Sequence, residues 1–500
     1  MTGAATRDAH DLEAVLADSP LSNGDLAPTG PERGTWGTYH LAALWIGLSI
    51  VTTTYTLASG LIAAGMTWWQ GLLTVSLGNL IVLIPMLLNS HPGTKYGIPF
   101  PVLVRSSFGI RGANVAAMAR ALVACGWFGI QTWIGALAID ALMTALTPGW
   151  ADFSLHTAVS FGVFWLIQVA IILRGIDGIR LLESMAAPLL LGGSLALLIW
   201  GFSAGGGIGN VFEASSKLVG DDQTFWTLFG PGLAANVGYW ITLSLNIPDF
   251  TRYARSQKSQ IVGQSIAMPL TMTGFSFIGI AVTSATIVVY GEPIWDPVAL
   301  TARLLDDMEV LLVAAMVVIV IAQLSTNMAA NVVSPSNDFS NLAPRLISFK
   351  MGGLITAFIG IVSFPWKLYQ DVGAYIFTWL VGYGSLLAAF GAVMIVDYWL
   401  LRRTRLDVLD LYRREGRYWF TGGYNVRALV AVAVGVIPVI PGFLDAATTE
   451  GGVVADPDFL DQLYRYGVFV AFGLAAAAYA ALMLSAGRAT ADQPVTAIAD

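Results

Sequence analysis

The sequence predicts an all-α integral membrane protein with about twelve transmembrane helices. Three observations predict this class: the composition, the length of the apolar runs and the charges between them. Of the 500 residues, 56% are hydrophobic and 11% are charged, whereas a soluble domain carries about 25% charged residues. The formal charge of -7 comes from acids in the tails and in alternate loops, which argues against nucleic acid as a partner. Membrane lipid is therefore the expected surrounding.

Apolar runs close to the roughly 20 residues that a helix needs to cross a bilayer recur along the chain. They lie approximately at residues 39–62, 69–88, 113–142, 155–173, 181–202, 225–245, 261–290, 310–333, 351–364, 374–400, 428–443 and 466–484. The polar stretches 1–36 and 487–500 flank them and are predicted to be disordered cytoplasmic tails.

The charges between the runs predict the orientation in the membrane. Basic residues follow every second span, among them Lys95, Arg105 and Arg111 after the second and Arg402, Arg403 and Arg405 after the tenth. The intervening loops carry acids, among them Asp221, Asp222, Asp306 and Asp307. Because basic loops stay on the cytoplasmic side, both termini are expected inside the cell and the protein in the cell (plasma) membrane.

Two spans have an irregular composition at bilayer depth. Thr52, Thr53, Thr54 and Thr56 crowd the middle of the first span in "LSIVTTTYTLASG", and three glycines and a proline interrupt the sixth in "LFGPGLAANVGYW". Many secondary transporters build their site from discontinuous helices at matching positions of two inverted repeats. We therefore expect repeats at 37–202 and 203–403, then a cytoplasmic loop and two further helices at 404–486. The alternative is that glycine and threonine merely allow close helix packing.

Ionisable groups are scarce inside the predicted spans. The four histidines fall in tails, loops or span ends, and no Asp, Glu or Lys is expected at a span centre. No buried proton-relay carboxylate is expected, and Arg120 of the third span is interpreted as a snorkelling or gate residue. A transported solute is therefore expected to be neutral. Without a nucleophile and base or a metal cluster at membrane depth, neither an enzyme nor a cofactor is predicted.

A tryptophan and a glutamine share one face of the third span. Trp127 and Gln131 are four residues apart in "GWFGIQTW", whereas Trp133 points elsewhere on the helix. An indole face stacks on a planar ring for about 1–3 kcal/mol, and an amide offers both a donor and an acceptor to a cyclic amide. Trp240 of the sixth span is a second candidate stacking surface. Ordinary packing of these side chains is the alternative.

The eighth span contains a candidate cation site in "IAQLSTNMAAN". Ala322, Ser325 and Thr326 stand at helical spacing on one face, where hydroxyl and carbonyl oxygens suit a hard monovalent cation. The alternative is that both hydroxyls bond their own backbone carbonyls four residues earlier. Asn327 and Asn331 lie along another edge, where an amide could meet the substrate.

Five sequence stretches between Trp36 and Phe443 together resemble one family. They are "GTKYGIPFPVLVRSSFGIRGA" after span two, "WFGIQTWIGALAID" in span three, "NIPDFTRYA" after span six, "STNMAAN" with "SPSNDFSN" in span eight, and "DYWLLRR" after span ten. The chain resembles the nucleobase:cation symporter-1 family, whose members include cytosine, uracil, allantoin and hydantoin permeases. The resemblance implies a leucine-transporter-like fold of two inverted five-helix repeats and alternating access driven by a cation gradient.

The resemblance also implies roles for individual residues. Substrate contacts fall on Trp127, Gln131, Trp240 and Asn331, and sodium contacts on Ala322, Ser325, Thr326 and the carbonyls of Gly47 and Ile50. The chain departs from the sodium-coupled hydantoin permease at Val51, which replaces a substrate-contacting glutamine, and at Met328, which replaces a proline. Thr52 or Thr53 is therefore expected to take over the contact that Val51 lacks.

The predicted function is a secondary active symporter that imports a neutral planar cyclic ureide or nucleobase of the allantoin, hydantoin or uracil type. The coupling ion is expected to be Na+, with H+ as the alternative because family members use either. A proton-coupled cytosine or purine permease is the runner-up. A channel is a further alternative, which would require a continuous polar pore lining rather than polar groups gathered near the midplane.

Overall fold

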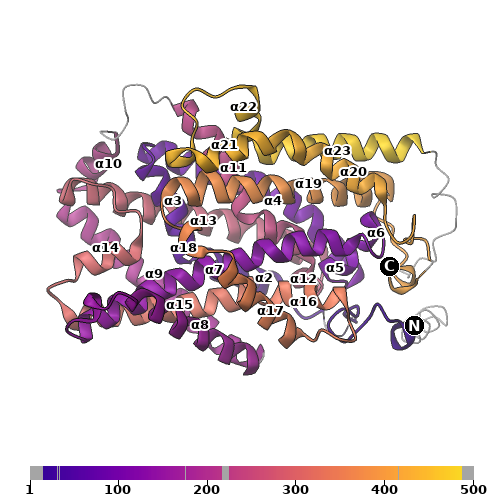
Figure 1. Cartoon of the computed structure of the whole chain (residues 1–500), viewed down its shortest axis with the longest axis horizontal. Helices are drawn as coiled ribbons and strands as arrows, with labels where there is room; N and C mark the ends of the chain where they lie inside the picture. The colour runs from indigo at the N-terminus through magenta and orange to yellow at the C-terminus, as the bar shows by residue number, and fades with distance from the viewer. Residues whose placement is uncertain are drawn as a thin grey trace.

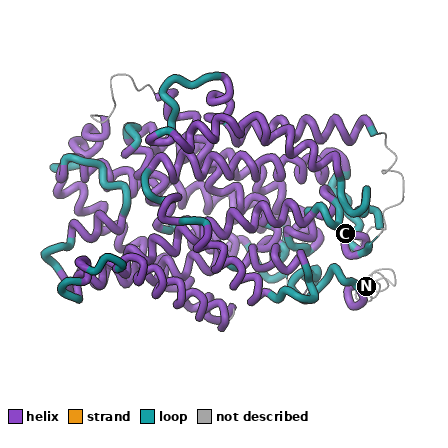
Figure 2. The backbone as a smooth tube through the Cα atoms, viewed as in Figure 1, coloured by secondary structure: helices purple, strands orange, loops and turns teal. Residues whose placement is uncertain are grey.

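The computed structural model describes residues 15–30, 32, 34–174, 176–216, 225–414 and 416–486, with the backbone alone described for 176–187. Asp221, Asp222 and the outer parts of both predicted tails lie outside these residues. Within the described ranges the chain forms helices and loops, without a β-strand (Figure 2). The helices run largely parallel or antiparallel to the long axis of the molecule (Figure 1). The all-helical class predicted from the composition is confirmed.

Long helices occupy all twelve of the predicted apolar runs. They are α2 (Thr38–Ser49) with α3 (Thr52–Ala63), α4 (Trp68–Tyr96), α7 (Ala113–Leu146), α8 (His156–Arg174), α9 (Ile176–Ala204), α11 (Phe225–Asn246), α13 (Gln257–Tyr290), α15 (Glu309–Asn331) with α16 (Val333–Leu342), α17 (Phe349–Val362), a π-helical segment (Gly373–Leu380) leading into α19 (Val381–Ile395) and a second π-helical segment (Val396–Leu401), α20 (Val426–Val436) with α21 (Ile440–Thr448), and α23 (Gly467–Ser485). Among the described residues, eight helices are long and apolar enough to cross a membrane, or ten if each bent pair counts as one span.

Short helices connect the spans. They are α5 (Phe100–Leu103), α6 (Arg105–Phe108), α10 (Ile208–Ser216), α12 (Pro248–Thr251), α14 (Pro297–Leu304), α18 (Pro365–Leu368) and α22 (Phe459–Arg465). Turns of 3-10 helix lie at Trp150–Asp152, Leu409–Tyr412, Ile437–Val439 and Glu450–Gly452.

The two irregular spans behave differently. The first is broken between α2 and α3, whose axes meet at 54°. The sixth was expected to be interrupted, and this is wrong, because α11 runs unbroken through Pro231. Its glycines serve close packing instead: a Cβ added at Gly238 would lie 2.4 Å from the carbonyl oxygen of Leu380. The packing alternative therefore holds for the sixth span.

A substitution at Gly238 tests this packing role. Gly238→Ala is expected to destabilise the protein by about 1–3 kcal/mol, because the added methyl group meets backbone that cannot move aside cheaply. Gly274 on α13 is the matched control, since a Cβ there meets nothing within 4 Å. Denaturant unfolding of both variants measures the difference. Equal stability of the two would contradict the packing role.

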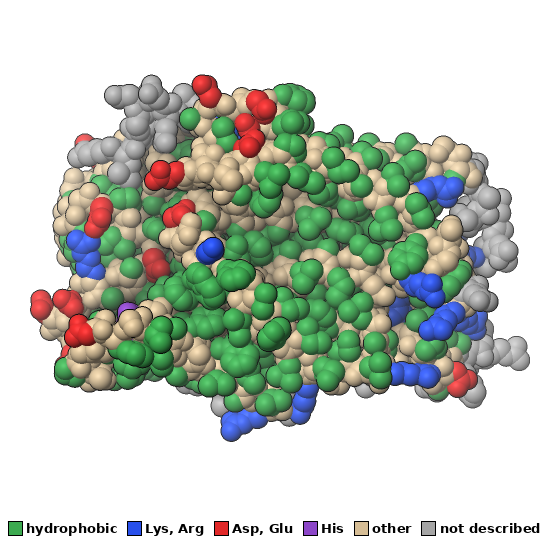
Figure 3. All heavy atoms as spheres, in the orientation of Figure 1, with side chains coloured by type: hydrophobic (Ala, Val, Ile, Leu, Met, Phe, Trp, Pro, Cys, Tyr) green, Lys and Arg blue, Asp and Glu red, His purple; other side chains and the backbone are tan. Residues whose placement is uncertain are grey.

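Charge is distributed unevenly along the bundle. Lys and Arg side chains gather at one end, on the right in Figure 3, and Asp and Glu at the opposite end and along the upper left. The segment beginning at Val15 and the end of α23 both lie at the basic end (Figure 1). The basic loops and the acidic loops, which alternate along the sequence, thus lie at opposite ends of the bundle.

Residues 15–30 were assigned to a disordered tail, and this is wrong for these residues. Leu26 is fully buried, and its carbonyl accepts a hydrogen bond from the hydroxyl of Tyr412 at 2.6 Å. Ser19 donates to the carbonyl of Tyr412, also at 2.6 Å. These partners lie almost 400 residues away along the chain. The composition of residues 15–30 could not reveal these contacts, because each is a single hydrogen bond to a backbone carbonyl between segments far apart in the sequence.

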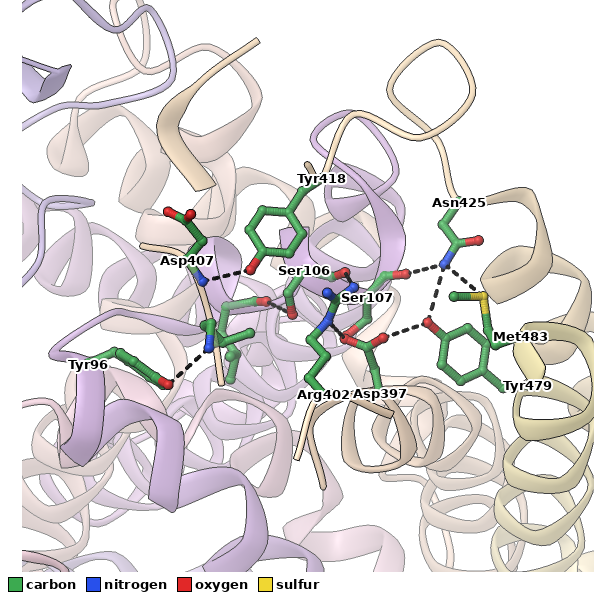
Figure 4. A network of polar contacts seen from close by, with 12 residues as sticks. Tyr96, Ser106, Ser107, Asp397, Arg402, Asp407, Tyr418, Asn425, Tyr479 and Met483 are labelled. Carbon is green, nitrogen blue, oxygen red and sulfur yellow. Dashed lines mark hydrogen bonds and ion pairs between the residues drawn. The ribbon is translucent and has the colours of Figure 1, made fainter. Parts of the chain in front are cut away.

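A buried ion pair anchors the end of the tenth span (Figure 4). The carboxylate of Asp397 accepts from Arg402 Nε at 2.6 Å and from the Tyr479 hydroxyl at 2.8 Å. Asn425 in the following loop donates to the carbonyl of Ser107 at 2.7 Å. The "DYWLLRR" stretch thus ties the end of the tenth span to α6, to α23 and to the loop after the tenth span.

Two arginines counted as loop charges are structural instead. Arg402 is largely buried in this ion pair. Arg105 is 1% exposed and donates to Asn341 Oδ1 at 2.6 Å and to the carbonyl of Leu411 at 2.9 Å. Both arginines still lie at the basic end of the bundle, so their burial does not change the predicted orientation in the membrane.

Candidate functional site

Trp127 and Gln131 lie on α7 in the interior of the bundle, 5% and 4% exposed. Two glycines allow α7 to approach its neighbours: a Cβ at Gly126 would meet the ring of Trp379 at 2.4 Å, and one at Gly129 the carbonyl of Gly360 at 2.4 Å. Trp127 Nε1 donates to the hydroxyl of Tyr383 at 3.0 Å. This bond fixes the indole, so that its ring rather than its N–H remains available.

Trp240 lies on α11 and is also buried. The ring of Trp45 on α2 stands edge-on to it at 5.0 Å, and Trp45 is fixed in turn by donating to Gln264 at 3.2 Å. The two tryptophans predicted from the sequence are therefore both held by neighbours. They are brought into one aromatic cluster, but through a third ring.

That third ring is Tyr239, which the sequence analysis missed. Its ring lies 5.3 Å from that of Trp127 and 4.9 Å from that of Trp240, each time with planes at 88°. Its hydroxyl is hydrogen-bonded to those of Thr53 at 2.8 Å and Thr54 at 3.1 Å. The available signal was its position directly before Trp240. Adjacent residues on a helix point in different directions, so this position alone did not indicate that Tyr239 would contact both indoles.

Three polar atoms of the predicted site are buried without a partner among the described residues. They are Gln131 Oε1, Trp240 Nε1 and Thr52 Oγ1. A buried polar atom without a hydrogen bond costs roughly 1–3 kcal/mol, so such atoms are uncommon in interiors. Here an acceptor, a donor and a hydroxyl remain unpartnered, on spans three, six and one. A ligand with a cyclic amide edge has the groups that would satisfy them.

Asn331 on α15 is buried, and its amide donates to Asn327 Oδ1 at 2.9 Å. Asn327 donates to Gln168 Oε1 at 2.6 Å and to the carbonyl of Phe128 at 3.0 Å. Asn327 is thus committed to holding α15 against α7 and α8. Of the two asparagines considered from the sequence, Asn331 is the one at the free end of this chain of amides.

The break in the first span changes the backbone bonds of Gly47 and Ile50. In an unbroken helix their carbonyls would accept from Val51 and Thr54. Instead Val51 N–H donates to Ser49 at 3.0 Å, and Thr54 N–H donates to Val51 at 3.1 Å. Both carbonyls predicted as cation ligands have thus lost their helical donors.

The predicted part of the eighth span lies against this break. Ile50 and Ala322 belong to one buried cluster. Ser325 is buried and Thr326 half-buried, and neither hydroxyl is hydrogen-bonded within the described part of the chain. Thr132, by contrast, donates to the carbonyl four residues earlier at 2.6 Å. The structure therefore does not have the alternative arrangement, in which the hydroxyls of Ser325 and Thr326 donate to the backbone carbonyls four residues earlier.

Buried carboxylates are present near the ends of spans, whereas the prediction concerned the span centres. Asp338 on α16 is fully buried, with its Oδ2 3.3 Å from Nη1 of Arg120, which is 1% exposed and so does not snorkel. Asp249 on α12 is 5% exposed and accepts from Phe100 N–H at 2.8 Å and from the hydroxyl of Ser334 at 2.9 Å. Sequence reasoning missed these carboxylates because they lie near span ends, where distant residues neutralise them.

A cleft of about 1710 Å³ borders the site. Its lining includes Asp371 and Glu450, the aromatic rings of Trp295 and Phe377, and Tyr383, the partner of Trp127. The cleft therefore approaches the aromatic cluster, whereas the candidate substrate residues themselves are buried beside it.

A helical membrane bundle with a broken first span and a buried aromatic and amide site is the architecture of a secondary transporter. The chain matches, over residues 28–471, the family model described as permease for cytosine/purines, uracil, thiamine, allantoin. It belongs to this family of permeases and is not an enzyme.

Characterised relatives span nearly the whole chain. It is 44% identical to the purine-uracil permease of Arabidopsis thaliana over 98% of this chain and 82% of the relative. It is 38% identical to the allantoin permease of Bacillus subtilis, over 89% and 93%. It also resembles the structure of a nucleobase-cation-symport-1 family transporter in a closed conformation with bromovinylhydantoin bound, with a TM-score of 0.75, 27% identity, and 93% and 96% of the two chains covered.

Proposed function

We propose that the protein is a symporter that imports a neutral planar cyclic ureide or nucleobase of the allantoin, hydantoin or uracil type, coupled to Na+. The observation that carries the proposal is the set of unpartnered atoms on Gln131, Trp240 and Thr52 beside buried indoles. One relative named for purine and uracil transport and one named for allantoin transport support a nucleobase or ureide as the substrate class. The ring would stack on Trp127 and Trp240, with its amide edge on Gln131 and Asn331.

The cation would bind where the broken first span meets α15. The carbonyls of Gly47, Ile50 and Ala322 and the hydroxyls of Ser325 and Thr326 would provide five oxygens, a donor set that suits a hard cation. Support comes from the lost helical donors of the first two carbonyls and from the free hydroxyls. The cation would stabilise the state that binds substrate, and by linkage the substrate would raise cation affinity by the same factor.

The orientation follows from the charge distribution. The basic end of the bundle would face the cytoplasm of the cell membrane, with both termini inside. The cleft on the acidic side would then be the route by which substrate arrives from outside.

Removal of the two hydroxyls tests the cation site. In Ser325→Ala/Thr326→Ala, substrate binding is expected to lose its dependence on Na+, so that its Kd equals the sodium-free value of the wild type. Titrations by tryptophan fluorescence with and without NaCl measure this. Ser385→Ala is the matched control, because that hydroxyl donates to the carbonyl of Val381 at 2.7 Å and is outside the site. Sodium dependence that persists in the double variant would contradict the assignment.

A proton-coupled cytosine or purine permease is the second candidate. The buried carboxylates of Asp249 and Asp338 favour this proton-coupled alternative. Both carboxylates interact electrostatically with the guanidinium of Arg120. Substrate binding that follows pH and ignores Na+, together with loss of that pH dependence in Asp249→Asn, would establish this alternative and exclude sodium at Ser325 and Thr326.

A further inference from the structure

Tyr239 occupies the position where the two candidate stacking surfaces come closest. Within the described chain, the Trp127 ring pairs with Tyr239, Tyr375 and Tyr383, and the Trp240 ring pairs with Trp45 and Tyr239. Tyr239 is therefore the one ring that both indoles share. A substrate ring that stacks on the side of either indole that faces Tyr239 lies beside its phenol.

The phenol is fixed rather than free to swing. Its hydroxyl is bonded to Thr53 and Thr54, which belong to the first turn of α3, just after the break in the first span. The hydroxyl of Tyr375 donates to the carbonyl of Thr53 at 3.3 Å, which supports the same turn from the other side. Leaving this place would cost Tyr239 both hydroxyl contacts in a buried setting.

A fixed ring at right angles to two indoles limits the width of anything that stacks on them. A single five- or six-membered ring needs only the face of one indole, whereas the second ring of a purine extends sideways in the same plane. With its centroid 5.3 Å and 4.9 Å from the two indole centroids and its plane perpendicular to both, the phenol fills space next to both indoles and leaves less room there for a second fused ring. Close-packed interiors do not yield readily to an added ring.

We propose that Tyr239 is the specificity-determining residue of the site, a fixed wall that admits monocyclic amides and excludes fused bicyclic ones. This inference rests on the proposed function and deepens it, since it selects ureides and pyrimidines over purines. It also assigns Thr53 a different role from the one expected: its hydroxyl holds the wall, which leaves Thr52 to meet the substrate.

The test compares one monocyclic and one bicyclic amide, uracil and hypoxanthine, by tryptophan fluorescence on the purified full-length protein. The measured quantity is the Kd for hypoxanthine divided by the Kd for uracil. In the wild type this ratio is expected to exceed about 10, within the range that steric discrimination in a pocket provides. In Tyr239→Ala it is expected to fall at least about tenfold, mainly because hypoxanthine binds more tightly.

Two further variants separate the wall from ordinary packing. Tyr239→Phe keeps the ring and loses the hydroxyl contacts, so its ratio is expected to stay within about threefold of the wild type. Tyr418→Ala removes an equally buried phenol at the basic end, where it contacts Arg402, and is expected to leave the ratio unchanged. A destabilising loss of packing alone would weaken both ligands equally and would not move the ratio.

The possible outcomes distinguish a failure of the role proposed for Tyr239 from a failure of the proposed transport function. A wild type that binds none of uracil, hypoxanthine, allantoin and a hydantoin overturns the proposed function and the wall with it; if it binds allantoin but not uracil, allantoin replaces uracil in the ratio. A wild type that binds uracil, with an unchanged ratio in Tyr239→Ala, overturns the wall alone. Where the alanine variant does not fold, Tyr239→Val provides the same reading, because valine also removes the ring. An equal loss of both ligands in a folded variant would make Tyr239 a direct contact and would likewise overturn its role as a size filter.

Discussion

Trp127→Ala is expected to weaken binding of the planar substrate about 5- to 150-fold, the range that corresponds to the loss of 1–3 kcal/mol of stacking. The indole is buried on α7 and oriented by the hydrogen bond from its Nε1 to Tyr383. Alanine removes the stacking surface and also leaves the Tyr383 hydroxyl without this donor. The measurement is a titration of uracil, allantoin and a hydantoin at saturating NaCl, with transport into proteoliposomes as a second readout.

The same sequence motif contains the matched control. Trp133 is six residues further along α7, where its ring lies against Phe161 at 6.2 Å and Trp366 at 6.3 Å on a partly exposed surface. Trp133→Ala is expected to leave the Kd unchanged, and Trp127→Phe to recover part of the affinity because a smaller aromatic face remains. Equal losses at Trp127 and Trp133 would mean that the motif is needed for folding rather than for stacking.

Some residues of the candidate site could be predicted from the sequence, and others could not. Trp127 and Gln131 could be paired because helical spacing of four residues places side chains on one face regardless of the fold. The cation site could be proposed because the spacing of Ala322, Ser325 and Thr326 is equally local, and because the family resemblance pointed to Gly47 and Ile50. Each of these arguments needs only one helix or one motif.

What escaped prediction depends on contacts between distant segments. Tyr239 pairs with Thr53 almost 190 residues away, and the bond between Asn327 and Gln168 joins two further spans. The same holds for the fold: apolar runs located the spans, but glycine and proline in α11 could not reveal whether the helix breaks or packs closely. That distinction is made by Leu380, whose carbonyl oxygen lies 2.4 Å from the position that a Cβ of Gly238 would take.

The geometry links the candidate site to the basic end of the bundle. Arg120 precedes Trp127 by seven residues on α7, and Asp338 follows Asn331 by seven, so each lies about 10 Å beyond a candidate substrate residue along its span. Asn246 at the end of α11 completes the group: with its carboxamide oxygen turned toward Arg120, it accepts from Nη2 at 3.2 Å. Spans three, six and eight are thus joined below the site by one buried polar cluster.

Asp338→Asn is expected to lower the free energy of unfolding by about 3–5 kcal/mol, because it removes the carboxylate that forms the ion pair with the buried guanidinium of Arg120. The loss of stability arises from the buried charge that remains on Arg120, not from the net stabilisation that the ion pair contributes in the wild type. Arg120→Gln/Asp338→Asn is therefore expected to be more stable than either single variant, since no charge of the pair remains. Denaturant unfolding in detergent, followed by tryptophan fluorescence, measures all four proteins of the cycle.

An exposed ion pair provides the comparison. Arg303 and Glu292 also form a salt bridge, but their side chains are 46% and 60% exposed. Arg303→Gln is expected to change stability by less than about 1 kcal/mol, because water replaces the lost partner. If Asp338→Asn costs no more than Arg303→Gln, the Arg120–Asp338 pair is solvated in the membrane-embedded protein. The cluster would then not seal the basic end of the bundle below Trp127 and Asn331, and water would have access to the candidate site from that side.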